Sequence, residues 1–306
     1  MKSTFEKARE FIYRNARPLD LARFQYHFEN GSKEAVMNAL SYYQNDDGGF
    51  GSAVEPDCWN PNSIPLHSGS AGDIIARELD FEDSKHPVIQ GLLSWYASGE
   101  HFNGKKWAIM VASNNDYPHA PWWHTDSNCS CYADYNGTAQ IAGFIVRYAD
   151  KDSDLFKLGV RIANEAIDAL SPDEIRDMHT CTCYIRMADL FERANATGYI
   201  PFDELKQKLH KSTHKLIVTD TSQWNGYVCQ PSTFLNSNKS EYYPENKDIA
   251  EYECEYIIKT QFEDGSWNIG WNWGGNYPDE WAISKNWWKS QWIIQNLLYL
   301  KGFGRI

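Results

Sequence analysis

Hydrophobic residues recur at helical spacing along most of the chain. Between residues 32 and 43 the apolar stripe consists of Ala35, Val36, Ala39, Leu40 and Tyr43. Runs of this kind predict about eleven helices. They cover residues 4–14, 18–28, 32–43, 67–79, 86–98, 138–149, 155–170, 174–193, 202–217, 247–261 and 281–300. No convincing strand alternation interrupts them, although short strands near residues 107–111 or 215–219 are left open.

Two of the predicted helices have informative sequences. Residues 171–174 are Ser-Pro-Asp-Glu, in which Ser would cap a helix, Pro would take its first position and Glu would close a capping box. Residues 281–300 are apolar on two faces, which predicts a buried helix.

Two connections between predicted helices share one pattern. Residues 44–51 are Gln-Asn-Asp-Asp-Gly-Gly-Phe-Gly, and residues 261–267 are Gln-Phe-Glu-Asp-Gly-Ser-Trp, with a weaker echo at residues 223–227. The Gly supplies a left-handed turn past the helix end, and the aromatic residue can pack between neighbouring helices. The Gln side chain can hydrogen-bond exposed backbone at that end. Such a repeat joins helix pairs into an array.

These segments resemble the QW-type repeats of the α/α-toroid superfamily, which includes triterpene cyclases and the β subunits of protein prenyltransferases. The Trp-rich final helix through residues 302–304 and the loop at residues 55–63 add to the resemblance. The chain also resembles bacterial proteins of this type that have no assigned reaction. The resemblance implies an all-α fold, an (α/α)6 toroid of about six helix pairs, in one domain over residues 1–306.

Charge and aromatic content restrict the classes of partner. The chain has 41 acidic and 29 basic residues, a net charge of −12, so we expect no nucleic-acid partner, because phosphate binding needs a positive surface. Aromatic residues make up 15% of the chain, which predicts an apolar cavity or a stacking surface. The sequence has no signal-peptide run and no bilayer-spanning run, so we expect a cytoplasmic protein without stable membrane insertion.

The cyclase motifs are not matched. Class II terpene cyclases use Asp-x-Asp-Asp, and the nearest segment, Asp80-Phe81-Glu82-Asp83, is interpreted as a solvated acidic loop. Asp46 and Asp47 lie in a Gly turn, whereas class I enzymes carry their Asp-rich magnesium sites on helices. A diphosphate site needs several Lys and Arg residues close together, and the sequence contains no such cluster.

The cysteines leave two alternatives. Cys129, Cys131, His179, Cys181 and Cys183 offer the thiolates and imidazole that suit zinc, and residues 179–184 superficially resemble a prenyltransferase zinc helix. However, residues two apart on a helix point away from each other. We therefore expect buried, reduced thiols, with no metal and no cofactor, and keep zinc as the alternative.

The loop over residues 114–126 is dense in polar and aromatic residues. Two prolines exclude a regular helix, and its aromatic surface predicts that Trp122 and Trp123 are buried in a lid over one mouth of the toroid. We interpret Asp116, His119 and His124 as catalytic candidates, because His can act as acid or base near neutral pH. The alternative is a packed structural cap.

Further candidates lie beside aromatic residues in loops that precede predicted helices. The additional carboxylates are Asp57, Asp134 and Glu280. The candidates for substrate binding are Trp59, Trp122, Trp123, Tyr135, Trp273 and Trp281. A tryptophan cluster, formed by Trp271, Trp273, Trp281, Trp287, Trp288 and Trp292, is expected to serve packing more than substrate contact.

Two functional classes and a non-catalytic one follow. The first is a toroid protein that binds an apolar, isoprenoid-like small molecule in an aromatic cavity, where aromatic faces could stabilise a carbocation and an acid could start the reaction. The second is a carbohydrate-active (α/α)6 barrel of the glycoside hydrolase or lyase type, with Trp platforms and paired carboxylates. The third is a ligand-binding protein without activity. An apolar pocket with one acid would favour the isoprenoid-binding class. An open groove with two facing carboxylates would favour the carbohydrate-active class.

Overall fold

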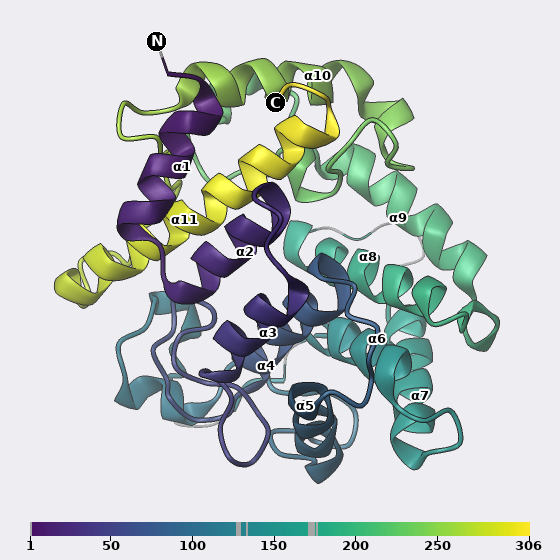
Figure 1. The fold of residues 1–306 in the computed structure, drawn as a ribbon. Helices are drawn as coiled ribbons and strands as arrows, with labels where there is room; N and C mark the ends of the chain where they lie inside the picture. Colours follow the sequence, from purple (N-terminus) through teal and green to yellow (C-terminus); the bar gives the residue numbers. More distant parts are fainter. Residues whose placement is uncertain (1, 127–129, 133, 171–174, 176) are drawn as a thin grey trace. The chain divides into compact units, whose positions relative to one another are not determined.

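The structure, a computed structural model, describes residues 2–126, 130–132, 134–170, 175 and 177–306. In these ranges the regular structure is helical and contains no strand, which confirms the predicted all-α class (Figure 1). The strand left open at residues 107–111 is reduced to isolated bridges, Phe102 to Trp107 and Met110 to Cys131. Residues 215–219 form no strand either.

The described residues contain eleven α-helices, within a few residues of the predicted ranges in most cases. They are α1 (Thr4–Asn15), α2 (Pro18–Phe28), α3 (Lys33–Ser41), α4 (Pro65–Asp73), α5 (Pro87–Ser98), α6 (Thr138–Tyr148), α7 (Asp154–Asp168), α8 (Met178–Arg193), α9 (Phe202–Leu216), α10 (Tyr243–Thr260) and α11 (Pro278–Gly302). The predicted single helix over residues 67–79 is divided in two. The α-helix α4 ends at Asp73, and a π-helical segment, Ile74–Glu78, continues it.

Two helix starts differ from the predictions. The capping sequence at residues 171–174 lies outside the described residues, and α8 begins at Met178. The Asp177 carboxylate caps it by accepting hydrogen bonds from the backbone N–H groups of His179 and Thr180, both at 3.0 Å. Glu280 lies in the first turn of α11 and not in a loop, because Pro278 already occupies the first helical position.

The chain divides into two compact units. The middle unit comprises Leu40–Ser212, and the terminal unit combines Met1–Ala39 with Thr213–Ile306. In the middle unit α6 packs against α4, α7 and α8, and in the terminal unit α11 packs against α1, α2 and α10. A single domain over the whole chain stays a prediction.

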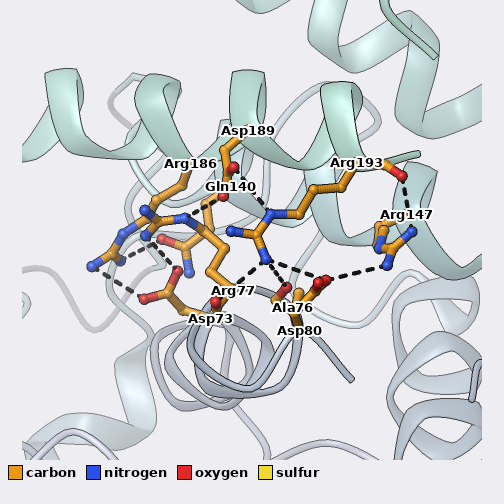
Figure 2. A network of polar contacts seen from close by, with 9 residues as sticks. All are labelled: Asp73, Ala76, Arg77, Asp80, Gln140, Arg147, Arg186, Asp189 and Arg193. Carbon is orange, nitrogen blue, oxygen red and sulfur yellow. Dashed lines mark hydrogen bonds and ion pairs between the residues drawn. The ribbon is translucent and has the colours of Figure 1, made fainter. Parts of the chain in front are cut away.

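Helices α4, α6 and α8 of the middle unit run parallel. Gln140, in the first turn of α6, donates to the carbonyl of Gly69 on α4 at 2.6 Å and accepts from Arg186, halfway along α8, at 2.7 Å. Further along all three, Asp80 follows the π-helical segment and meets Arg147 of α6 at 3.3 Å and Arg193 of α8 at 3.2 Å. The contacts proceed in the same residue order on each helix (Figure 2).

A charged network fills the space between the C-terminal halves of these helices (Figure 2). The Asp189 carboxylate accepts from Arg77 and from Arg193, both at 3.0 Å. Asp80, whose backbone takes a left-handed φ of 42°, pairs with Arg147 and Arg193. Residues 80–83 form the loop that the sequence predicted, with Glu82 and Asp83 exposed. The Asp80 carboxylate is half-exposed, and it also pairs with two guanidinium groups, which the sequence did not predict.

The core of the middle unit is centred on α6. Every residue of this helix except Arg147 is buried. Gly143 permits the close approach of α8, since a Cβ at that position would lie 3.0 Å from the Met187 Cα. The parallel helices are thus held by apolar packing along α6 and by the charged network at their C-terminal halves.

The two repeated turns have equivalent geometry, one in each unit. The Gln44 amide donates to the carbonyls of Gly48 and Val88, both at 2.9 Å. The Gln261 amide donates to the carbonyls of Gly265 at 3.0 Å and Thr4 at 2.9 Å. In each case the second carbonyl belongs to the first turn of another helix, α5 or α1. The predicted role of Gln as a backbone hydrogen-bond donor is confirmed.

The echo at residues 223–227 has a different structure. The Gln223 amide donates at 2.9 Å to the carboxylate of Asp220, three residues earlier. Its bond is local and joins no second helix. The resemblance of residues 223–227 to the two repeated turns therefore does not extend to their structure.

Candidate functional site

Two loops of the middle unit, residues 51–64 and 108–125, lie together and are called here the loop layer. The backbone N–H of Trp59 donates to the carbonyl of Pro118 at 2.9 Å, and that of Ala120 donates to the carbonyl of Asp57 at 2.8 Å. Cys58 and His119 form an isolated antiparallel bridge between these bonds. The sequence predicted no contact between these two loops. The structure brings candidate residues from both into one layer.

Buried amides hold the loops in place. The Asn60 side chain donates to the Oγ of Ser113 and to the Oδ1 of Asn114, both at 2.9 Å. Asn114 in turn donates to the carbonyl of Trp123 at 3.1 Å. Neither Asn60 nor Asn114 was a sequence candidate, and their presence in turn-rich polar segments would have been the only indication.

An apolar cluster lies within the loop layer. Its buried members are Cys58, Ile64, Ala108 and Val111, and the partly buried Leu66, Trp123 and Tyr132 pack against them. Burial raises the pKa of the Cys58 thiol to about 12, although a backbone hydrogen bond at Asn60 opposes the effect. The thiol therefore stays protonated at neutral pH, which disfavours a nucleophilic role.

The loop layer adjoins the N-terminal ends of α4 and α6. Ile64 of the apolar cluster is the residue before α4, and the backbone N–H of Trp107 donates to the Oγ1 of Thr138, the first residue of α6, at 3.0 Å. The loop layer is thus attached to the starts of two helices of the middle unit.

His119 and His124 form the most specific contact of the loop layer. The Nε2 of His119 lies 3.1 Å from the Nδ1 of His124, and the two rings are stacked with centroids 5.3 Å apart. The Nδ1 of His119 lies 2.6 Å from the carbonyl of Tyr117. A carbonyl only accepts, so this nitrogen carries the proton.

The proton positions of the pair follow from that bond. Neutral His119 has its lone pair on Nε2, which must accept from the Nδ1–H of His124. The lone pair of His124 is then on Nε2. Protonation of His124 at Nε2 leaves the bond to His119 intact, so His124 can take up and release a proton without rearrangement of its partner.

Burial distinguishes the two histidines. His119 is buried and His124 is exposed. Burial lowers the pKa of His119, the hydrogen bond to the Tyr117 carbonyl opposes that change, and the charge of His124 adds to it. His119 is thus kept neutral as an acceptor, and His124 is the member that reaches solvent.

The remaining loop candidates occupy different environments. The expectation that both tryptophans of residues 122–123 are buried is wrong for Trp122, which is 42% exposed. Trp59 and Trp123 are partly buried. Asp116 is exposed, and Asp57 is buried at 2% exposure. The loop layer therefore presents Trp122, Asp116 and His124 to solvent rather than enclosing all its aromatic groups.

Asp134 and Tyr135 lie before α6. Asp134 is exposed, and its Oδ1 accepts from the backbone N–H of Asn136 at 2.7 Å. Tyr135 is buried beneath the ammonium group of Lys106, 4.8 Å from the ring centroid. Burial raises the pKa of Tyr135. Their roles in catalysis and substrate binding stay predictions.

Trp273, Trp281 and Glu280 belong to the terminal unit. Trp273 is fully buried, and its ring centroid lies 5.6 Å from that of Trp281 and 6.5 Å from that of Tyr277. These contacts are those of packed rings. Substrate binding by Trp273 and Trp281 stays a prediction.

The described cysteines are free thiols. Cys181 and Cys183 are buried in α8, and the Sγ of Cys183 donates to the Oδ1 of Asn136 at 3.2 Å. Cys129, a zinc candidate of the sequence, lies outside the described residues. Within the described ranges no three His, Cys, Asp or Glu side chains are grouped so that they could hold a metal ion.

None of the described helices is both long and apolar enough to cross a membrane. Within the middle unit, the loop layer with its hydrogen-bonded histidine pair is the candidate site for proton transfer. No family model, curated protein or solved structure matches the chain.

Proposed function

We propose that the loop layer is an acid–base site for a polar ligand of the carbohydrate class, with His124 as the group that transfers the proton. The observation that carries this proposal is the hydrogen bond between His119 and His124. This bond joins the buried, neutral imidazole of His119, which accepts, to the exposed imidazole of His124. The Nε2 of His124 can bind a proton while the bond to His119 stays intact. General acid–base catalysis requires a side chain that can hold and release a proton within hydrogen-bond reach of the substrate.

A lyase type of reaction fits this pair better than a hydrolase type. Glycoside hydrolases use two carboxylates, whereas the contact found here joins two imidazoles. In the proposed reaction, His124 removes the proton on the carbon beside a uronate carboxylate. The electrons of that C–H bond form a C=C bond, the bond to the glycosidic oxygen breaks, and that oxygen takes a proton from water.

The exposed aromatic surface supports a carbohydrate over an isoprenoid. Trp122 offers a ring surface to solvent, and Asp116 and His124 of the same loop are also exposed, which suits a ligand with both C–H faces and hydroxyl groups. An isoprenoid-like ligand needs a dry aromatic cavity and a strong acid. It remains the competing proposal, together with binding without catalysis.

We also propose that the helix pairs form an α/α toroid. Two observations support it: α4, α6 and α8 are parallel, with α5 and α7 between them in the chain. The same Gln-containing turn occurs at Gln44 and at Gln261, and joins helix ends in both units. Parallel inner helices joined by antiparallel outer helices are the arrangement expected of helical hairpins in an array.

The catalytic proposal is tested with polygalacturonate, alginate and arabinoxylan. Elimination produces an unsaturated sugar that absorbs ultraviolet light, and hydrolysis produces reducing ends without that absorbance. We expect the wild-type protein to generate the unsaturated product from one of the uronate polymers. His124→Ala should lower the rate by about 10²-fold or more, the usual contribution of a general base.

Two controls make this result specific. His210→Ala changes a partly buried histidine on α9 and should leave the rate unchanged. His119→Gln keeps a polar side chain but loses the imidazole acceptor, and should shift the pH profile of the rate. Reducing ends without unsaturated product would disprove the lyase type. An equal rate for His124→Ala and the wild type would disprove the site.

A further inference from the structure

A second aromatic surface lies on the terminal unit. Residues 223–228 and 265–277 contain no Asp, Glu, Lys or Arg, although the chain carries a net charge of −12. The two segments lie side by side: the Asn268 amide donates to the carbonyl of Asn225 at 3.2 Å, and a Cβ on Gly270 would lie 3.1 Å from the Gly226 carbonyl carbon.

Trp271 is the centre of this surface. Its ring centroid lies 5.1 Å from that of Tyr227, 5.1 Å from that of Trp288 and 5.3 Å from that of Trp292, with interplanar angles of 69–82°. Tyr227 is 48% exposed, and the three tryptophans are partly exposed. Edge-to-face packing fixes the rings while part of their area still reaches solvent.

Exposed amides border the rings. Asn225, Asn268 and Asn272 are all exposed, and each comes from one of the two uncharged segments. The Asn225 Oδ1 lies 3.3 Å from the Tyr256 hydroxyl, and the Asn272 Oδ1 accepts from the backbone N–H of Gly274 at 2.8 Å. These bonds orient two of the amides. An amide offers both donors and an acceptor, the set that a sugar hydroxyl requires.

We propose that this aromatic–amide surface, formed by Tyr227, Trp271, Trp288 and Trp292 with Asn225, Asn268 and Asn272, binds a neutral oligosaccharide. Aromatic rings cover the C–H faces of sugar rings, and the amides pair with hydroxyl groups. The lack of charge in both segments disfavours phosphate and uronate ligands. On α11 the exposed Lys285 lies three residues before Trp288, whereas binding to an anionic membrane needs a cluster of basic residues. The site goes beyond the proposed function, since it lies on the other unit and does not require the histidine pair.

Native gels that contain hydroxyethyl cellulose, galactomannan or neutral arabinoxylan test this proposal. The charge of −12 carries the protein toward the anode, and binding slows it. We expect at least one polymer to retard the wild-type protein. Tyr227→Ala removes a half-exposed ring with little risk to folding, and should weaken the affinity about fivefold.

Tyr199→Ala is the matched control. Tyr199 is 51% exposed and also makes one edge-to-face contact, with Phe156 at 5.5 Å, but it belongs to the middle unit. It should bind like the wild type, and so should His124→Ala, which separates this proposal from the catalytic one. The proposal is overturned if no polymer retards the protein, or if Tyr227→Ala binds as well as the wild type. It is equally overturned if Tyr227 proves to be needed for vesicle binding or self-association instead.

Discussion

Gln44 and Gln261 make the same two hydrogen bonds in different units of the chain. Each amide donates to the carbonyl of the Gly four residues later and to a carbonyl in the first turn of another helix. One side chain thereby stabilises its own turn and fixes a neighbouring helix. The glutamine is therefore a connector between helices, and its contribution to stability can be measured.

We expect Gln44→Ala and Gln261→Ala each to lower the free energy of unfolding by about 1–3 kcal/mol, because partly buried carbonyls lose their donor. Urea unfolding followed by tryptophan fluorescence measures the change. Gln44→Glu keeps the shape but removes the donor, so it should be at least as destabilising. Gln223→Ala is the control, because that amide bonds only within its own exposed turn, and it should cause no measurable change. Equal effects at the three positions would contradict this account.

The glycines of the two turns give a second prediction. Gly48 and Gly265 have φ angles of 90° and 94°, and an added Cβ would lie 2.2 Å from the Gly91 carbonyl oxygen or 2.1 Å from that of Lys7. Gly99 has a φ of 76° with no atom within 4 Å of such a Cβ, so it isolates the backbone cost.

We expect Gly99→Ala to cost about 1–2 kcal/mol, the penalty of a left-handed conformation alone. Gly48→Ala and Gly265→Ala should each cost at least about 2 kcal/mol more, since two backbone segments must move apart. Thermal unfolding compares the three variants. A similar loss for all of them would show that the close approach between the turn and the helix is not needed for stability.

The helices and the repeated turns could be predicted because their causes are local. Apolar spacing, a Gly past a helix end and a Gln at fixed distance are all visible within a short stretch of sequence. The π-helical segment Ile74–Glu78 could not be found in this way. It lies where Asp73 and Arg77 meet Arg186 and Asp189 of α8, a helix that is distant in the sequence.

The candidate site was predictable only in part, for the same reason. His119 and His124 could be selected by their chemistry within one loop. Their hydrogen bond depends on the Tyr117 carbonyl and on the pairing of that loop with residues 57–59. The exposure of Trp122 also depends on which side of the loop is covered, and composition does not determine that.

The charged network between α4, α6 and α8 gives a third prediction. Asp189 joins Arg77 to Arg193, and all three side chains are largely removed from solvent. Asp189→Asn keeps the size of the side chain but loses one acceptor and the charge. We expect it to lower the free energy of unfolding by about 1–3 kcal/mol, because two guanidinium groups lose their shared partner.

Asp154→Asn is the control for the network. Asp154 pairs with Lys157 at 3.2 Å, but its side chain is fully exposed and lies in the first turn of α7, so its removal should destabilise the protein much less than Asp189→Asn does. Added salt should change the stability of the wild type and of Asp189→Asn to a similar small extent, because solvent screens partly buried pairs weakly. A large salt dependence that Asp189→Asn abolishes would show that the network behaves as a surface ion pair.

The buried Glu253 gives the last prediction, which concerns pH. Burial raises the pKa of this carboxyl from 4.5 to about 7, and the hydrogen bonds from the Ser232 hydroxyl and backbone N–H oppose that change. Between these two pH values the folded state binds more protons than the unfolded state. The stability that Glu253 contributes is therefore present in acid and is lost as the pH rises through 7.

From pH 5 to pH 8, the wild-type free energy of unfolding should fall by about 2–3 kcal/mol relative to that of Glu253→Gln, which cannot ionise. The pKa values of His119, His101 and His179 are lowered by desolvation, and they give the opposite slope, because the stabilisation is lost as the pH falls below 6.5. These groups are common to both proteins and cancel in the difference. Urea unfolding at the two pH values measures it. Glu255→Gln, which changes an exposed carboxylate paired with Arg305, should show no such pH-dependent difference. A constant difference between the wild type and Glu253→Gln would mean that Glu253 has the same charge at both pH values, so that the packing around Ser232 accommodates an ionised carboxylate without cost.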